Sequence, residues 1–274
     1  MNQRPMIGRT SHLPVQGLRT RVEVRGDGPP LLLISGIWGE VAAWRRVLPY
    51  LPGFRTIAFD APGIGDTEFP PYPMSLPALA RFAVGVLDAV GEPHAHVLGI
   101  SFGGLVAQHV ATLAPRRVDR LVLVSTTSGM LHLPGQPQAM LGLMNPLPTD
   151  RAGAAAGRTF GGRVRRDPAV LPRLHLAPPR SMKAYLHRLS GLTGWWGSPW
   201  SITQPTLVLT GDDDPIVPPV NSRILASLVP GSRLVVVPGG GHLMLFDSPA
   251  EVAPHVAAFL GGSGRTRWTD TLAS

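Results

Sequence analysis

The stretch Gly99-Ile100-Ser101-Phe102-Gly103-Gly104 is the most informative part of this chain. The apolar run 96–100 precedes the serine, and apolar residues at helical spacing follow it as far as Pro115. This order predicts a strand, a sharp turn with Ser101 at its apex, and a helix. Small neighbours permit the strained backbone of such a turn, which lifts the serine hydroxyl clear of the sheet. We therefore predict that Ser101 is a nucleophile, with a purely structural glycine-rich turn as the alternative.

An acidic partner for this serine is predicted on a second loop. The short apolar strand 206–210 ends in Gly211-Asp212-Asp213-Asp214-Pro215, and the carboxyl ends of parallel strands lie at one edge of a sheet. Of the three aspartates we select Asp214, because it is third after the glycine and four residues before Pro218, a spacing that resembles the acid loop of α/β-hydrolases. A surface loop, or a cluster of aspartates that binds a hard cation, is the alternative.

A basic partner is predicted after the next strand. The apolar run 233–237 is followed by Pro238-Gly239-Gly240-Gly241 and then by His242. The three glycines predict that this histidine lies on a mobile loop rather than in packed structure. Of the nine histidines, it is the one expected at a strand end on the edge that carries Ser101. The chain order Ser, Asp, His is that of α/β-hydrolase triads.

These residues together predict one catalytic mechanism. His242 takes the proton of the Ser101 hydroxyl, and Asp214 fixes the imidazole tautomer and stabilises the imidazolium that forms. The developing oxyanion needs two hydrogen-bond donors. We predict that they are the backbone N–H of Phe102 and that of Ile37, which lies in the loop after an earlier apolar strand.

Strands and helices alternate along most of the chain, which predicts an α/β fold with a mostly parallel sheet flanked by helices. Strands are predicted at 19–25, 31–35, 55–59, 97–100, 121–125, 206–210 and 233–237, and helices at 76–90, 102–113, 219–228 and 249–260. Between these, short helical pieces are predicted at 136–144, 152–160, 169–174 and 181–189. We therefore predict a core of residues 1–126 and 204–274, a helical cap or lid at 127–203, and a disordered tail after about residue 261.

Tryptophans near the predicted active site are candidates for binding substrate. Trp195, Trp196 and Trp200 lie close together near the end of the cap, and Trp38 follows Ile37 in the oxyanion loop. Such rings offer a large apolar surface, which suits an acyl chain. The alternative is that the cap tryptophans only pack the cap against the core.

Composition limits the classes of protein that fit. The 274 residues are 44% hydrophobic and include no cysteine, which allows a sizeable core and excludes disulfides and thiol catalysis. No apolar run is long enough to span a bilayer and no signal peptide is evident, so we expect a cytoplasmic protein.

The net charge is +8, but the arginines are not interleaved with aromatic residues, so nucleic-acid binding is not expected. His94 and His96 have a metal-like spacing without a third ligand nearby, and neither a metal nor another cofactor is expected.

The chain resembles the α/β-hydrolase superfamily and, within it, the intracellular poly(3-hydroxyalkanoate) depolymerases of the medium-chain-length type. The wider resemblance depends on Ser101, Asp214 and His242 in their loops. The narrower one depends on less general stretches: 124–129 (VSTTSG), 133–137 (LPGQP), 160–162 (FGG), 165–168 (RRDP), 204–209 (QPTLVL), 211–215 (GDDDP) and Asn221. It extends from about residue 31 to residue 260.

The resemblance implies an α/β-hydrolase fold with a cap inserted after the sixth core strand. It also implies a serine esterase that hydrolyses a stored polyester through an acyl-enzyme and releases 3-hydroxy acids, and it leaves association with storage granules open. The chain departs from the family at Ser35, where a histidine is frequent, at Phe102, where a tryptophan is frequent, and in the length of 238–241. A general carboxylesterase or lipase acting on small acyl esters, a carbon–carbon bond hydrolase and a catalytically silent granule-binding protein remain alternatives.

Overall fold

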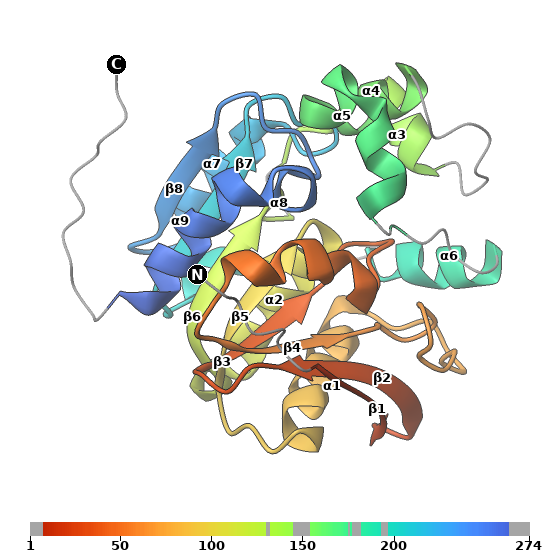
Figure 1. Ribbon diagram of the computed structural model, residues 1–274, viewed down its shortest axis with the longest axis vertical. Helices are drawn as coiled ribbons and strands as arrows, with labels where there is room; N and C mark the ends of the chain where they lie inside the picture. Colours follow the sequence, from red (N-terminus) through yellow and green to blue (C-terminus); the bar gives the residue numbers. More distant parts are fainter. Residues whose placement is uncertain are drawn as a thin grey trace.

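The computed structural model describes residues 8–129, 132–144, 154–174, 176, 182–192 and 197–262 (Figure 1). Eight strands of this part of the chain form one sheet in the order β1-β2-β4-β3-β5-β6-β7-β8. They are β1 (Arg9–Val15), β2 (Leu18–Arg25), β3 (Pro30–Ile34), β4 (Arg55–Phe59), β5 (Ala95–Ile100), β6 (Val118–Val124), β7 (Thr206–Gly211) and β8 (Arg233–Val237). The pairs β1–β2 and β2–β4 are antiparallel and the others parallel, which confirms the predicted α/β class.

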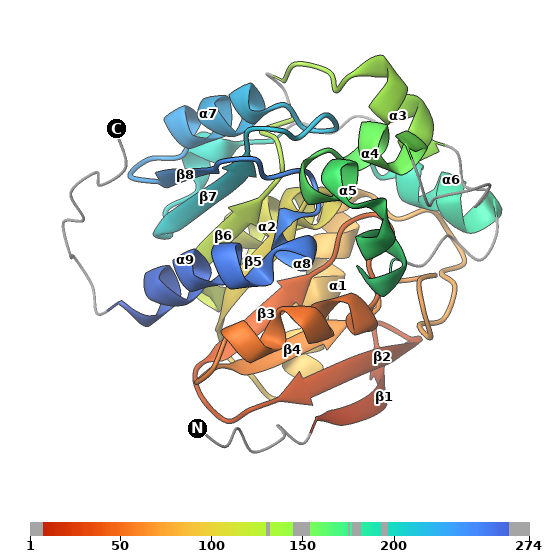
Figure 2. The same ribbon diagram turned by 45° about the horizontal axis from the view of Figure 1, so that its top comes forward.

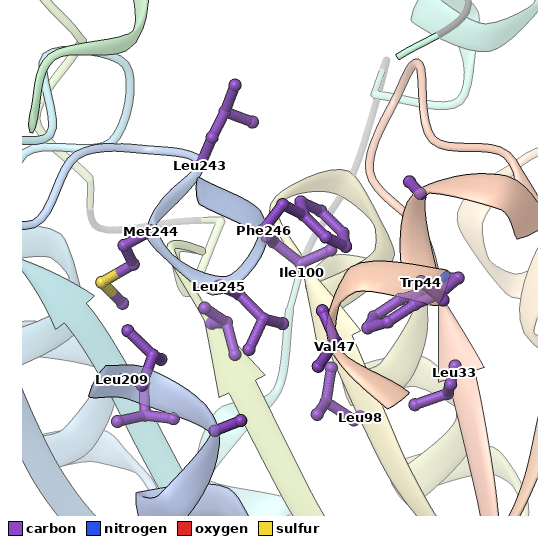
Figure 3. Close-up of a cluster of buried hydrophobic side chains, with 14 of the residues drawn as sticks. Leu33, Trp44, Val47, Leu98, Ile100, Leu209, Leu243, Met244, Leu245 and Phe246 are labelled. Carbon is purple, nitrogen blue, oxygen red and sulfur yellow. The ribbon is translucent and has the colours of Figure 1, made fainter. Parts of the chain in front are cut away.

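The central strands are apolar on both faces because helices cover both sides of the sheet. Leu32 contributes to the core beneath α1 (Leu76–Ala89), α2 (Phe102–Leu113) and α7 (Pro219–Leu228), whereas its neighbour Leu33 contributes to the opposite core. That second core is closed by η1 (Val41–Arg46), η2 (Leu48–Tyr50), α8 (Met244–Asp247) and α9 (Pro249–Gly261). Figure 3 shows part of it, with Trp44 and Val47 beside Leu98.

The segment between β6 and β7 carries the cap. Its described elements are α3 (Pro137–Met144), α4 (Ala154–Phe160), α5 (Gly162–Arg166), η4 (Pro168–Leu174), α6 (Met182–Ser190) and η5 (Pro199–Ser201). Figures 1 and 2 show α3, α4, α5 and α6 gathered at one end of the sheet. The insertion follows the sixth strand, as predicted, whereas the boundaries at residues 127 and 203 stay a prediction.

The sequence-based prediction missed one strand of the sheet. Strand β1 is polar and mostly exposed, so neither alternation nor an apolar run marks it. It is held by antiparallel pairing with β2 through a tight turn in which Gln16 and Gly17 both have positive φ, 47° and 82°. The predicted tail after residue 261 lies almost wholly outside the described residues.

Candidate active site

Ser101 lies at the turn between β5 and α2 in a backbone conformation that few non-glycine residues adopt, with φ 54° and ψ −122°. Its N–H donates to the carbonyl of Val124 at 2.8 Å, and the Thr126 hydroxyl donates to its carbonyl at 2.8 Å. The neighbouring glycines are required by close packing, since a Cβ on Gly103 would lie 2.2 Å from the Ile34 carbonyl oxygen. The strained serine is therefore held on both sides by the core of the sheet.

Ser101, His242 and Asp214 form one hydrogen-bonded series. His242 Nε2 lies 2.9 Å from Ser101 Oγ, and His242 Nδ1 lies 2.9 Å from Asp214 Oδ2. The other Asp214 oxygen, Oδ1, accepts hydrogen bonds from the backbone N–H groups of Ile216 and Val217, both at 2.9 Å. The structure thus brings together all three residues that the sequence predicted for the triad.

The loop that carries His242 differs from the prediction. We expected a mobile loop after three glycines, but His242 is only 4% exposed and its N–H donates to the carbonyl of Phe160 in the cap at 2.8 Å. The glycines permit close packing here, because a Cβ on Gly241 would lie 2.5 Å from that same carbonyl oxygen. The cap, rather than the loop itself, holds the histidine in place.

The three adjacent aspartates have separate contacts. Asp212 accepts a hydrogen bond from the N–H of Gly239 at 2.6 Å, within the two neighbouring loops. Asp213 accepts from the N–H of Gly162 at 2.7 Å and pairs with Arg165 at 2.8 Å, which ties the loop to the cap. Of these three, Asp214 is the aspartate hydrogen-bonded to the histidine, which supports its selection from the sequence.

The two residues predicted for the oxyanion hole lie beside Ser101. Phe102 is the first residue of α2, and both it and Ile37 line a cavity together with Ser101. A Cβ on Gly36, the residue before Ile37, would lie 3.5 Å from the Ser101 Cβ. Ser35, which replaces a frequent histidine, accepts a hydrogen bond from the Trp44 indole at 2.7 Å and so braces this loop through its own side chain.

Two cavities of unequal size meet at Ser101. The larger has a volume of about 700 Å³ and is bounded by the core on one side and by α3 and α6 on the other. Its lining is mostly apolar and includes Ile37, Phe102, Leu105, Leu133, Met140, Leu143, Tyr185, Leu189, Leu192, Ile216 and Val217. The smaller has a volume of about 40 Å³ and is lined in part by Ile100, Leu243 and Phe246; Figure 3 shows the Phe246 ring beside Ile100.

The predicted substrate-binding tryptophans have different positions. Trp38 is 5% exposed and lines the smaller cavity. Trp200 lies on η5, is 54% exposed and does not contribute to the described lining of either cavity. Trp195 and Trp196 lie outside the described residues. The apolar face of α6 was not predicted to line the site, although Tyr185 and Leu189 lie four residues apart, a helical interval that could have revealed it.

The described ranges contain neither a candidate metal site nor a helix that could span a membrane. No group of three or more His, Asp or Glu side chains there is placed to hold a metal ion. His94 instead contacts Asp119 at 2.7 Å on the surface. None of the described helices is both long enough and apolar enough to cross a bilayer.

Comparisons with known proteins agree with this geometry. The model of the alpha/beta hydrolase family matches residues 31–255. The chain is 36% identical to the poly(3-hydroxyalkanoate) depolymerase of Ectopseudomonas oleovorans, over 93% of each protein. It is 30% identical to the 2-hydroxymuconate semialdehyde hydrolase of Pseudomonas sp. (strain CF600), over 93% of this chain and 94% of that relative. Among solved structures, a meta-cleavage product hydrolase from Pseudomonas fluorescens IP01 has the same fold, with a TM-score of 0.79, 23% identity, and coverage of 93% of this chain and 98% of that one.

Proposed function

This chain belongs to the alpha/beta hydrolase family, and from that premise we propose that it is a serine ester hydrolase acting on poly(3-hydroxyalkanoate) or its oligomers. The observation that carries the proposal is the hydrogen-bonded series from Asp214 through His242 to the strained Ser101, placed at the floor of a mostly apolar cavity. The similarity to a depolymerase over 93% of the chain supports the choice of polyester as substrate.

The proposed mechanism follows from these positions. His242 accepts the proton of Ser101 as the hydroxyl attacks the ester carbonyl, and Asp214 stabilises the imidazolium. The oxyanion is held by the N–H groups of Ile37 and Phe102. His242 then protonates the departing alcohol, and water hydrolyses the acyl-enzyme by the same route in reverse, which releases a hydroxy acid.

The larger cavity is the proposed place for the acyl chain. Its volume and apolar lining suit a medium-length alkyl side chain, which would leave water on binding. Leu133 and Leu192 line it and are 52% and 40% exposed, so they form a partly open apolar rim. We propose that this rim contacts the surface of a stored polyester granule.

Two measurements test the proposal. A fluorophosphonate should label the wild-type protein and the control Ser227→Ala, in which an exposed hydroxyl on α7 is removed, but not Ser101→Ala. Initial rates are then compared on amorphous medium-chain polyester particles, amorphous poly(3-hydroxybutyrate) and nitrophenyl esters of graded length. Hydrolysis of the medium-chain particles supports the proposal, whereas labelling with activity on short esters alone identifies a general carboxylesterase. Particle binding without labelling or hydrolysis identifies a silent granule-binding protein.

A further inference from the structure

Arg188 is a buried cation of the cap beside the proposed oxyanion hole. It lies on α6, is 7% exposed, and donates a hydrogen bond from Nη2 to the carbonyl oxygen of Gly36 at 3.2 Å. Its guanidinium also lies over the Phe102 ring, 4.7 Å from the centroid. Burial lowers the pKa of Arg188 to about 10, so the group is still cationic at neutral pH. Its Nε and Nη1 have no hydrogen-bond partner among the described residues.

The contact with Gly36 bears directly on Ile37. The Gly36 carbonyl and the Ile37 N–H belong to one planar peptide unit, in which the two groups point in opposite directions. A donor fixed on the carbonyl therefore fixes the direction of the N–H, and a positively charged donor polarises the peptide so that its N–H becomes a stronger donor. The N–H of Gly39 also donates to the Gly36 carbonyl, at 3.1 Å, which restrains the same unit.

We propose that Arg188 is a positioning residue for the oxyanion hole, through which the cap orients and polarises the Gly36–Ile37 peptide and steadies Phe102. This inference rests on the proposed serine hydrolase function, because it assigns the N–H groups of Ile37 and Phe102 to the oxyanion. It makes a catalytic element of the core dependent on a side chain of α6.

Two observations separate this role from substrate binding and from simple packing. Arg188 is absent from the described lining of both cavities at Ser101, whereas Tyr185 and Leu189 of the same helix line the larger one. A buried cation without a carboxylate partner in the described ranges costs stability, and an apolar side chain would pack α6 with less desolvation. The arginine therefore fits a role in the reaction better than a role in folding.

The test compares Arg188→Met, Arg188→Lys and the control Lys183→Met. Lys183 is an exposed cation of the same helix that lies 5.2 Å from the Phe69 ring, so its loss removes a cap contact without touching the oxyanion loop. With a short nitrophenyl ester, we expect Arg188→Met to lower kcat by about 10- to 100-fold with KM changed less than about 3-fold, Arg188→Lys to restore part of kcat, and Lys183→Met to change either constant less than about 2-fold.

Affinity for a trifluoromethyl ketone distinguishes a loss of oxyanion stabilisation from a general loosening of the packing around Arg188. This inhibitor forms a hemiketal with a serine, so its oxyanion reports on the hole, whereas a non-reactive ester analogue reports on the cavity alone. Arg188→Met should lower the affinity for the ketone in proportion to the loss of kcat/KM. It should leave the affinity for the analogue unchanged. A folded Arg188→Met protein with wild-type kcat overturns the inference, as does an equal loss of affinity for the ketone and for the non-reactive analogue. Activity that survives in Ser101→Ala would instead overturn the proposed function itself.

Discussion

The edge of the sheet that carries Ser101 and the cap that covers it are built differently. At the edge, each oxygen of Asp214 is hydrogen-bonded, and Ser101 and His242 are held by backbone contacts. The cap contributes mainly apolar side chains, with a few polar links such as those of Arg165 and Arg188 to the core. From this difference we predict that the reacting groups lie at the edge, that the polar links of the cap position them, and that its apolar side chains select the substrate.

The largest expected effect comes from removing the proposed nucleophile or base at the edge. Ser101→Ala and His242→Ala should each lower kcat by at least about 10³-fold on short esters, because the hydroxyl and its proton acceptor act as one unit. The double variant should lose scarcely more than either single one, which steady-state kinetics with a sensitive fluorogenic ester can measure. Losses that multiply in the double variant would show that the two residues act independently.

The three aspartates provide a second comparison within the edge. Asp214→Asn should lower kcat by about 10³-fold, because the amide no longer fixes the histidine tautomer. Asp213→Asn breaks an ion pair with the cap and should lower kcat by about 10-fold or less. Asp212→Asn changes an exposed contact between two loops and should lower kcat less than Asp213→Asn does. The measurement is kcat for each of the three variants, and the prediction is their order. Thermal melting checks that each variant is folded. A larger loss in Asp212→Asn than in Asp214→Asn would contradict the assignment of the acid.

The same contrast explains what the sequence could predict. The strained turn at Ser101 is marked by local glycines and by continuous apolar strands, and parallel topology then brings Asp214 and His242 to it. The immobilised His242 loop and the buried Arg188 depend on contacts between distant segments, which no local pattern encodes. Strand β1 was missed for a related reason, since its pairing with β2 rather than its own composition makes it a strand.

Substitutions in the rim of the larger cavity test whether the cap selects the substrate. Replacing Leu133 and Leu192 together by Ser should lower hydrolysis of medium-chain polyester particles by about 10-fold, because apolar contact area at the particle surface is lost. Hydrolysis of a nitrophenyl acetate, which needs only the space at Ser101, should change less than about 2-fold.

Leu113 offers a matched control for these rim substitutions. It is 51% exposed but lies at the end of α2 and not in the described cavity lining, so Leu113→Ser should affect neither substrate. Binding is measured separately by sedimentation with the particles. Equal loss on both substrates in the rim variant would remove the case for a polymer-specific contact and favour the general carboxylesterase.

The smallest expected effect concerns a second buried carboxylate, which differs from Asp214 in its surroundings. Asp247 on α8 is 1% exposed, and no basic side chain of the described residues forms an ion pair with its carboxylate within 4 Å. Burial raises the pKa of Asp247, and the Ser248 hydroxyl and the charges of Arg163 and Arg166 offset only part of this rise. A raised pKa means that the folded state favours the protonated form, so stability is lost as the pH rises through that pKa.

Asp247→Asn removes the charge and should raise the melting temperature by roughly 2–4 °C at pH 7. The gain should shrink as the pH falls below the ordinary aspartate pKa of about 3.9, where the carboxyl is protonated in both the folded and the unfolded state. A gain that is independent of pH, or a loss of stability at pH 7, would show that the ionised carboxylate has a stabilising partner.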